Sequence, residues 1–253
     1  MIVVSPPVIC IPARLASTRL PQKLLLRESG TPLLIHTCRR AAQAFGAEAV
    51  LVCADTSELV TVAQEYGFAA RLTGSHHQSG TDRIAEAAAV LSAPIIVNVQ
   101  GDEPEIDPAA IRRVAALLDE QPEAAMATLA TPGNAADQLN PNSVKVLVDH
   151  AGRALMFSRA PLVWDRDAAG PVQHCLRHLG IYAYRRDILL GYAALPSSQL
   201  EQSEKLEQLR ALEAGHRIAC AVVSHAAAGI DSRADYDAFL ARLRASPPDQ
   251  AEP

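Results

Sequence analysis

Short apolar runs rich in β-branched residues alternate with amphipathic segments through the first half of the chain. The runs VICI, AVLVCAD, FAARLTG, IIVNVQGD and AAMATLA predict strands, and the segments between them predict helices over residues 32–45, 57–67, 80–91 and 107–121. Parallel strands joined by helices are buried on both faces, so they lack alternating polar residues. The pattern predicts an α/β protein with a doubly wound, mostly parallel sheet.

The rhythm of the sequence changes after about Thr131. Three strand-like segments, SVKVLVD, RALMFSR and LGIYAYR, follow each other closely and predict antiparallel pairs in a smaller lobe at about residues 131–185. One helix is then expected in LEQSEKLEQLRALEAG, followed by a strand in IACAVV and a last helix in ADYDAFLARLRA. We therefore expect a single domain over residues 1–246, with a Pro-rich disordered tail at 247–253.

Composition narrows the classes of partner. The 253 residues carry a formal net charge of −5, which disfavours general nucleic-acid binding. Five cysteines are scattered without a C-x-x-C pair, as is typical of buried free thiols in a reducing compartment. The N-terminus lacks a signal-peptide pattern, and no apolar stretch is long enough to cross a membrane. We expect a cytoplasmic protein that binds neither nucleic acid nor membranes.

A basic loop follows the first predicted strand. In CIPARLASTRLPQK, residues 10–23, three cations and two hydroxyl side chains lie together without a carboxylate. Open α/β sheets bind ligands at the carboxyl ends of their strands, and Arg14, Arg19 and Lys23 suit a polyphosphate there. A solvated basic loop is the alternative. The two common nucleotide-loop signatures, G-x-G-x-x-G and G-x-x-x-x-G-K-[ST], are absent from this stretch.

Acidic residues gather in a second motif, VNVQGDEPEI, which spans residues 97–106. Asp102, Glu103 and Glu105 directly follow an apolar strand, and a divalent cation between carboxylate and phosphate oxygens would relieve their repulsion. The alternative is a turn that leads into a helix N-cap, which explains Asp107 better than Asp102. In a third motif, HHQSGTDR, two adjacent histidines without further ligands disfavour a metal site.

Seven segments occur in the order found in 3-deoxy-manno-octulosonate cytidylyltransferases. They are IPARLASTRLPQK, HHQSGTDR, VNVQGDEPEI, NPNSVKVLVD, FSRAPLVWDRD, RHLGIYAYR and LEQLRALEAG, and the chain resembles this family from about Val8 to Ala245. The resemblance implies a reaction of CTP with 3-deoxy-D-manno-octulosonate (Kdo) that yields CMP-Kdo for lipopolysaccharide synthesis, with release of diphosphate and use of Mg²⁺. It also implies a nucleotide-diphospho-sugar transferase type of sheet, with the smaller antiparallel lobe forming a homodimer.

The resemblance assigns site residues position by position. The residues that match CTP-binding positions of the family are Arg14, Ser17, Lys23, Gly80, Arg83 and Gln100. The residues that match its Kdo-binding positions are Arg159, His178, Tyr182, Glu207 and Gln208. Asp102 and Asp231 match its two metal ligands, and together with Lys23 they form the expected catalytic set.

The sequence departs from the family pattern at two places. Gln22 stands where the basic loop usually has glycine, and the segment before the second metal ligand is AAAGIDS instead of one that ends in GVDT. For Asp231 the alternative role is a helix N-cap, which Ser232 or Asp235 could also fill.

Three other functions stay open at this point. One is a cytidylyltransferase for another 2-keto sugar acid, such as 8-amino-Kdo or a sialic acid. The others are a catalytically inactive nucleotide-binding regulator and a structural oligomerising protein. The presence of both Asp102 and Asp231 argues against the inactive regulator, and a structural protein would not need Arg14, Lys23 and Asp102 at strand ends.

Overall fold

The computed structural model describes residues 6–17, 19–77, 79–226 and 229–245. The chain divides into two compact units. Unit 1 comprises Met1–Ala93, Asn98–Ile111 and Ala227–Pro253, and unit 2 comprises Pro94–Val97 and Arg112–Ala226. The lobe expected at residues 131–185 lies within unit 2. The expected tail at 247–253 lies outside the described residues, and the domain bounds 1–246 stay a prediction.

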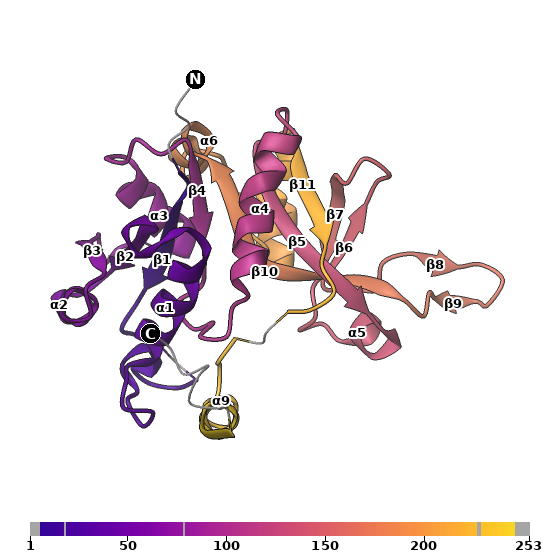
Figure 1. The fold of residues 1–253 in the computed structure, drawn as a ribbon. Coiled ribbons are helices and arrows are strands. Elements are labelled where there is room, and N and C mark those ends of the chain that lie inside the picture. The colour runs from indigo at the N-terminus through magenta and orange to yellow at the C-terminus, as the bar shows by residue number, and fades with distance from the viewer. Residues whose placement is uncertain (1–5, 18, 78, 227–228, 246–253) are drawn as a thin grey trace. The chain divides into compact units, whose positions relative to one another are not determined.

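Unit 1 is built on parallel strands (Figure 1), which are β1 (Val8–Ala13), β2 (Val50–Ala54) and β3 (Ala69–Leu72). Ala13 pairs with Ala54, and Ala54 pairs with Leu72, so the three strands end together at their carboxyl ends. The helices that pack against them are α1 (Leu33–Phe45), α2 (Ser57–Glu65) and α3 (Gly80–Ala88). Two 3₁₀ helices, η1 (Lys23–Leu25) and η2 (Ala47–Ala49), and the last helix α9 (Arg233–Ala245) also belong to unit 1.

Unit 2 has a mixed sheet. Strand β5 (Met126–Gly133) lies parallel to β11 (Ile218–Val222) and antiparallel to β10 (Cys175–Arg185). Strand β6 (Lys145–Val148) pairs antiparallel with β10 and with β7 (Ala154–Ser158), and β8 (Trp164–Asp165) and β9 (Gly170–Pro171) form a separate hairpin. The short helices of this unit are α5 (Ala135–Leu139), α6 (Arg186–Tyr192), α7 (Gln199–Glu204) and α8 (Gln208–Glu213). Strand β4 (Ile95–Asn98) and helix α4 (Pro108–Glu120) contain residues of both units.

The α/β class, with mostly parallel strands and an added antiparallel portion, is confirmed. Helix α2 begins at Ser57, the first residue of the predicted helix, and is capped by Thr56, whose side chain accepts from the Leu59 N–H. One local prediction is wrong. The single helix expected from residue 200 onward is two helices, because Lys205 takes a left-handed backbone conformation (φ 55°) that ends α7.

The expectation of free thiols is confirmed, since the five cysteines are free and four of them are buried. Cys175 is the exception, because it is half-exposed at the start of β10. Among the described residues, no helix has both the length and the apolar character needed to cross a membrane.

Candidate active site

The basic loop leaves β1 at Ala13 and is anchored by the Leu15 N–H, which donates to Asp55 Oδ1 at 3.0 Å. Arg14 is exposed and Ser17 is half-buried, and within the described residues neither side chain makes a hydrogen bond. The chain then turns inward at Leu20, which is buried in an apolar cluster with Leu33, Ile230, Tyr236, Phe239 and Leu240. Burial of Leu20 and of Leu24 in η1 holds the intervening backbone, so Lys23 starts from a fixed position.

Gln22, which replaces the usual loop glycine, has φ 52° and ψ 31° and immediately precedes Lys23. This is the left-handed region, where a side chain clashes with the backbone and where glycine is favoured. The local geometry that a glycine would adopt freely is therefore present here, although the residue is glutamine.

We expect Gln22→Gly to stabilise the protein by about 0.5–1 kcal/mol, because the relief of the left-handed strain exceeds the entropy that glycine loses on folding. Urea unfolding measures the change in the free energy of unfolding. Gln22→Ala keeps the Cβ atom and is the control, for which we expect no increase in the free energy of unfolding. A Gly variant that is no more stable than the Ala variant would contradict the strain at this position.

Asp102 is positioned by a close backbone approach. A Cβ atom on Gly101 would lie 3.1 Å from the carbonyl oxygen of Pro12, so any larger residue would push this turn away from the end of β1. The Thr37 hydroxyl donates to the Gly101 carbonyl at 3.0 Å. The Asp102 carbonyl in turn accepts from the Ile230 N–H at 2.9 Å, which fastens the segment before α9 to this turn.

Lys23 joins the two carboxylates. Its Nζ lies 2.5 Å from Asp102 Oδ2, 3.1 Å from Asp231 Oδ1 and 2.8 Å from the carbonyl oxygen of Ile230. Arg19 Nη2 reaches the same Asp231 oxygen at 2.8 Å from the solvent side. Residues far apart in the sequence, which we predicted as one catalytic set, therefore lie together in unit 1.

The helix-cap alternative for Asp231 is wrong. Ser232 caps α9, since its hydroxyl accepts from the Asp235 N–H at 3.2 Å and the Asp235 carboxylate accepts from the Ser232 N–H at 2.8 Å. The Asp231 carboxylate instead contacts Lys23 and Arg19. Helix α9 is further held by a forked pair between Arg242 and Glu105, with Nη2 2.6 Å from Oε2.

Glu103, next to Asp102, is partly buried. Burial, and secondarily the charge of Asp102, raises the pKa of Glu103 to about 8. At pH 7 this carboxyl is therefore mostly neutral and adds little negative charge beside Asp102.

The residues expected near cytosine are also in unit 1. Gly80 opens α3, where a Cβ atom would lie 3.2 Å from Pro12 Cγ. Arg83 is buried, and its Nη1 donates to Thr73 Oγ1 at 2.7 Å and to the Gly74 carbonyl at 3.3 Å. Gln100 Nε2 donates to Asn98 Oδ1 at 3.3 Å, which leaves the side-chain oxygen Oε1 of Gln100 as an acceptor. Arg83 thus fixes the start of the loop that leads to Gly80, and its contact with a base stays a prediction.

The residues expected to bind Kdo lie in unit 2, and Arg159 is tied firmly into it. Arg159 Nε donates to the Glu204 carbonyl at 2.7 Å and Nη1 donates to the Pro141 carbonyl at 3.0 Å. The Glu204 carboxylate accepts from Ser158 Oγ at 2.6 Å and from the Arg159 N–H at 2.8 Å. Lys145 is fully buried, and its Nζ donates to the Arg159 carbonyl at 2.5 Å. The backbone and part of the guanidinium of Arg159 are therefore immobilised.

His178 and Tyr182 form a ring cluster, with centroids 5.3 Å apart. The Thr128 hydroxyl donates its one proton to the Ile181 carbonyl at 2.8 Å, so His178 Nε2, at 3.0 Å, is the donor to Thr128 and Nδ1 is an acceptor. Burial raises the pKa of Tyr182 well above its usual value.

Glu207 and Gln208 lie at the start of α8, which packs against β7. The Glu207 carbonyl accepts from the Tyr192 hydroxyl at 2.6 Å. Gln208 is 5% exposed, and its Nε2 is buried without a hydrogen-bond partner among the described residues. A buried amide donor of this kind is costly unless a ligand or water accepts from it.

We expect His178 to make stability depend on pH. Burial lowers its pKa to about 3, whereas an unfolded histidine titrates near 6.5. Below about pH 6.5 the histidine of the unfolded chain binds a proton, whereas His178 in the native state does not. The free energy of unfolding therefore falls as the pH decreases towards 3. Between pH 7 and pH 5, wild type should lose about 1–2 kcal/mol more than His178→Gln in urea unfolding. Parallel pH profiles for the two proteins would contradict a neutral His178 imidazole in the native state.

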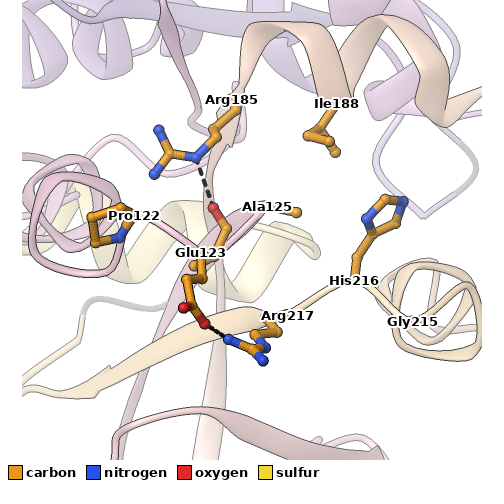
Figure 2. A pocket seen from close by; sticks show the side chains of 9 residues that line it. Pro122, Glu123, Ala125, Arg185, Ile188, Gly215, His216 and Arg217 are labelled. Carbon is orange, nitrogen blue, oxygen red and sulfur yellow. Dashed lines mark hydrogen bonds and ion pairs between the residues drawn. The ribbon is translucent and has the colours of Figure 1, made fainter.

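A further pocket lies in unit 2 at the turn between α8 and β11. It measures about 260 Å³ and is lined by Pro122, Glu123, Ala124, Ala125, Arg185, Ile188, Gly215, His216 and Arg217. Figure 2 shows Glu123 paired with Arg217, and Arg185 donating to a backbone carbonyl, which is that of Ala124 at 2.8 Å. No predicted site residue lines this pocket, and it is smaller than typical small-molecule sites of about 300–1,000 Å³.

Sequence analysis missed two contributors to these sites. Arg19 was expected among the phosphate-binding cations of the basic loop, but its contact with Asp231 was not predicted. The Ile230 carbonyl belongs to the backbone and leaves no residue-type signal. Lys145 did leave one, because a lysine between two valines in SVKVLVD is unusual for a buried strand.

Comparisons with known proteins agree with the resemblance in the sequence. The family model of cytidylyltransferases matches residues 8–218. A 3-deoxy-manno-octulosonate cytidylyltransferase from Thioalkalivibrio sulfidiphilus (strain HL-EbGR7) is 47% identical over 247 residues, which cover 94% of this chain and 98% of the relative.

Solved structures are similar as well. A CMP:2-keto-3-deoxy-manno-octonic acid synthetase complexed with CTP is 39% identical, with a TM-score of 0.90, and the match covers 95% of this chain and 99% of that chain. A cytidylyltransferase from Leptospira borgpetersenii serovar Hardjo-bovis (strain JB197), 17% identical over 97% of this chain and 90% of its own, shares the fold with a TM-score of 0.64. The chain belongs to the cytidylyltransferase family and, within it, to the 3-deoxy-manno-octulosonate cytidylyltransferases.

Proposed function

We propose that the protein transfers CMP from CTP to the anomeric hydroxyl of Kdo, with release of diphosphate. The observation that carries the proposal is the convergence of Lys23, Asp102 and Asp231 at the end of the basic loop. Membership of the family and the CTP complex of a 39% identical relative support the nucleotide. The hydroxyl attacks the α-phosphorus in line with the departing diphosphate, so no covalent enzyme intermediate is required.

Charge repulsion is the main obstacle, because a sugar acid must approach a nucleoside triphosphate. Lys23 and the exposed guanidinium groups of Arg14 and Arg19 supply positive charge beside the end of β1. We assign the triphosphate to these three side chains. They neutralise the charge that develops on the leaving diphosphate, as preorganised cations do in phosphoryl-transfer sites.

The donor set fits Mg²⁺, which the family implies. Two carboxylate oxygens and one carbonyl oxygen, from Asp102, Asp231 and Ile230, already surround a cation, the Lys23 ammonium. Mg²⁺ prefers oxygen ligands and is usually bound by one or two carboxylates together with substrate phosphates. We propose Asp102 and Asp231 as its ligands; when bound, the ion would neutralise phosphate charge and orient the reacting groups.

For the sugar acid we propose unit 2 residues. Arg159 Nη2 has no partner within the described residues, so the guanidinium retains donors for the Kdo carboxylate. The unpaired Gln208 Nε2 supplies a second buried donor, for a hydroxyl or carboxylate oxygen. His178 Nδ1, Tyr182 and Glu207 complete the proposed set as polar groups that orient the sugar hydroxyls.

We expect strong selection of CTP over UTP. The side-chain oxygen Oε1 of Gln100 can accept from the N4 amino group of cytosine, whereas uracil presents an oxygen at that position. Mispaired polar groups at such a site discriminate by several powers of ten. Wild type should therefore prefer CTP over UTP by at least about a thousandfold in kcat/KM. Gln100→Ala should lose most of this preference. Gln64→Ala, on the exposed face of α2, is the control and should keep it. Equal turnover of UTP and CTP by wild type would contradict the assignment.

Release of diphosphate, measured over a grid of nucleoside triphosphates and sugar acids, tests the proposed function as a whole. We expect turnover with CTP and Kdo in the presence of Mg²⁺. The grid includes 8-amino-Kdo and a sialic acid, and a preference for either would replace Kdo as the substrate. Absence of turnover with every pair would refute the proposal.

We also propose a cytoplasmic homodimer. Cytoplasmic location suits an enzyme that consumes CTP. Val163 and Trp164, at the start of the β8–β9 hairpin, are exposed large apolar side chains that the family's dimerisation lobe would bury. Sedimentation equilibrium measures the oligomeric state directly.

A further inference from the structure

The ammonium group of Lys23 is saturated by its three contacts. An ammonium has three N–H donors, and Asp102 Oδ2, Asp231 Oδ1 and the Ile230 carbonyl lie at 2.5, 3.1 and 2.8 Å from Nζ. The Lys23 side chain is only 14% exposed. Lys23 is thus the internal counter-cation of this pair of carboxylates.

The oxygens are held more rigidly than the lysine. The Ile230 N–H donates to the Asp102 carbonyl, and Ile230 is buried in the cluster that contains Leu20, so the two acidic segments are fastened to each other. Lysine, by contrast, carries its charge on a flexible stem of four carbons. The ammonium can therefore leave without rearrangement of the backbone that bears the carboxylates.

The same oxygens are the ligands proposed for the divalent cation. Two cations on one pair of carboxylates repel each other strongly when they are partly shielded from water. Arg19 contacts Asp231 as well, but from a side chain that is 69% exposed, so Lys23 is the main competitor. The phosphates of CTP are an alternative partner for the Lys23 ammonium, because they are anionic hydrogen-bond acceptors.

We infer that Lys23 holds the cation position between Asp102 and Asp231 in the free protein and yields it to a divalent cation only when CTP phosphates bind its ammonium. The inference rests on the proposed function, in which CTP and Mg²⁺ share this site. Binding of metal and of nucleotide are then coupled, and by reciprocity each raises the affinity for the other by the same factor. Competition from Lys23 thus lowers the affinity of the two carboxylates for a divalent cation when CTP is absent.

A titration with Mn²⁺, with free Mn²⁺ followed by electron paramagnetic resonance, tests this without any turnover. In the absence of nucleotide, Lys23→Met should bind Mn²⁺ at least about tenfold more tightly than wild type, because its competitor is gone. Lys205→Met is the matched control, since Lys205 is exposed in unit 2, and it should bind Mn²⁺ as wild type does. CTP affinity measured with and without Mn²⁺ should show a smaller coupling factor in Lys23→Met than in wild type.

A second measurement keeps the wild-type sequence. The chain has three lysines, at positions 23, 145 and 205, so protein labelled with ¹³C at the lysine Cε gives few and assignable resonances. The Lys23 resonance should shift when Mg²⁺ and CTP are added together, with smaller changes at 145 and 205. A Lys23 resonance that stays fixed at saturating Mg²⁺ and CTP would overturn the inference.

The outcomes separate the inference from the proposed function. If wild type binds Mn²⁺ in the presence of CTP but Lys23→Met without nucleotide binds it no more tightly than wild type, Lys23 does not compete, and the inference fails while the proposed metal site stands. If neither protein binds Mn²⁺, with or without CTP, the proposed metal site fails and the inference fails with it.

Discussion

Asp231→Asn is expected to lower the turnover of CTP and Kdo at least about a hundredfold, with the fold retained. Removing one charged ligand weakens the binding of Mg²⁺ and the stabilisation of transition-state charge together. The fold should survive because Asp231 does not cap α9: Ser232 and Asp235 form that cap without its carboxylate. Thermal unfolding and a titration of activity with Mg²⁺ measure the two effects separately.

Asp237→Asn is the matched control for this variant. Asp237 is an exposed aspartate of α9, and its Oδ1 lies 2.9 Å from Arg233 Nε. This substitution also removes a carboxylate from an ion pair, but the pair lies within α9 and does not include Lys23. An exposed pair contributes little, and activity should stay near wild type. Asp231→Asn with full activity at ordinary Mg²⁺ concentrations would remove Asp231 from the set of metal ligands.

The meeting of Asp102 and Asp231 could be predicted from the family resemblance, because both residues match metal ligands of the family although about 130 residues separate them. The convergence on Lys23 needed tertiary information. Burial of Leu20 and Ile230 in one cluster, and the backbone bond between Ile230 and Asp102, bring the segments to contact distance.

The strands of unit 1 were predictable for a different reason, since continuous apolar runs are required when both faces of a sheet are covered. The break between α7 and α8 was not predictable from the helix-forming segment LEQSEKLEQLRALEAG. Glu204 accepts from Ser158 and from the Arg159 N–H, at 2.6 and 2.8 Å. These tertiary hydrogen bonds hold the end of α7 against β7 and accompany the left-handed turn at Lys205, so local propensity is overridden.

Lys145→Met is expected to reduce the free energy of unfolding by about 3–5 kcal/mol, the largest stability effect that we predict. Lys145 has no exposed surface, and burial lowers its pKa. Its ammonium donates to the carbonyls of Asn140, Ser143 and Arg159, at 3.0, 2.7 and 2.5 Å. Methionine fills a similar volume but leaves these three acceptors without a donor, and each unsatisfied buried group costs about 1–3 kcal/mol.

Urea unfolding of Lys145→Met beside Lys205→Met tests this role, because the second variant removes a lysine that is exposed and should change stability by less than about 0.5 kcal/mol. The three carbonyls belong to segments that enclose Arg159, whose guanidinium we assign to the Kdo carboxylate. Loss of the buried cation should therefore also raise the KM for Kdo more than the KM for CTP, since the basic loop and Asp102 belong to unit 1. A free energy of unfolding for Lys145→Met that lies within about 1 kcal/mol of the wild-type value would contradict this role. In that case water or a rearranged loop satisfies the carbonyls, and Lys145 does not hold Arg159 in place.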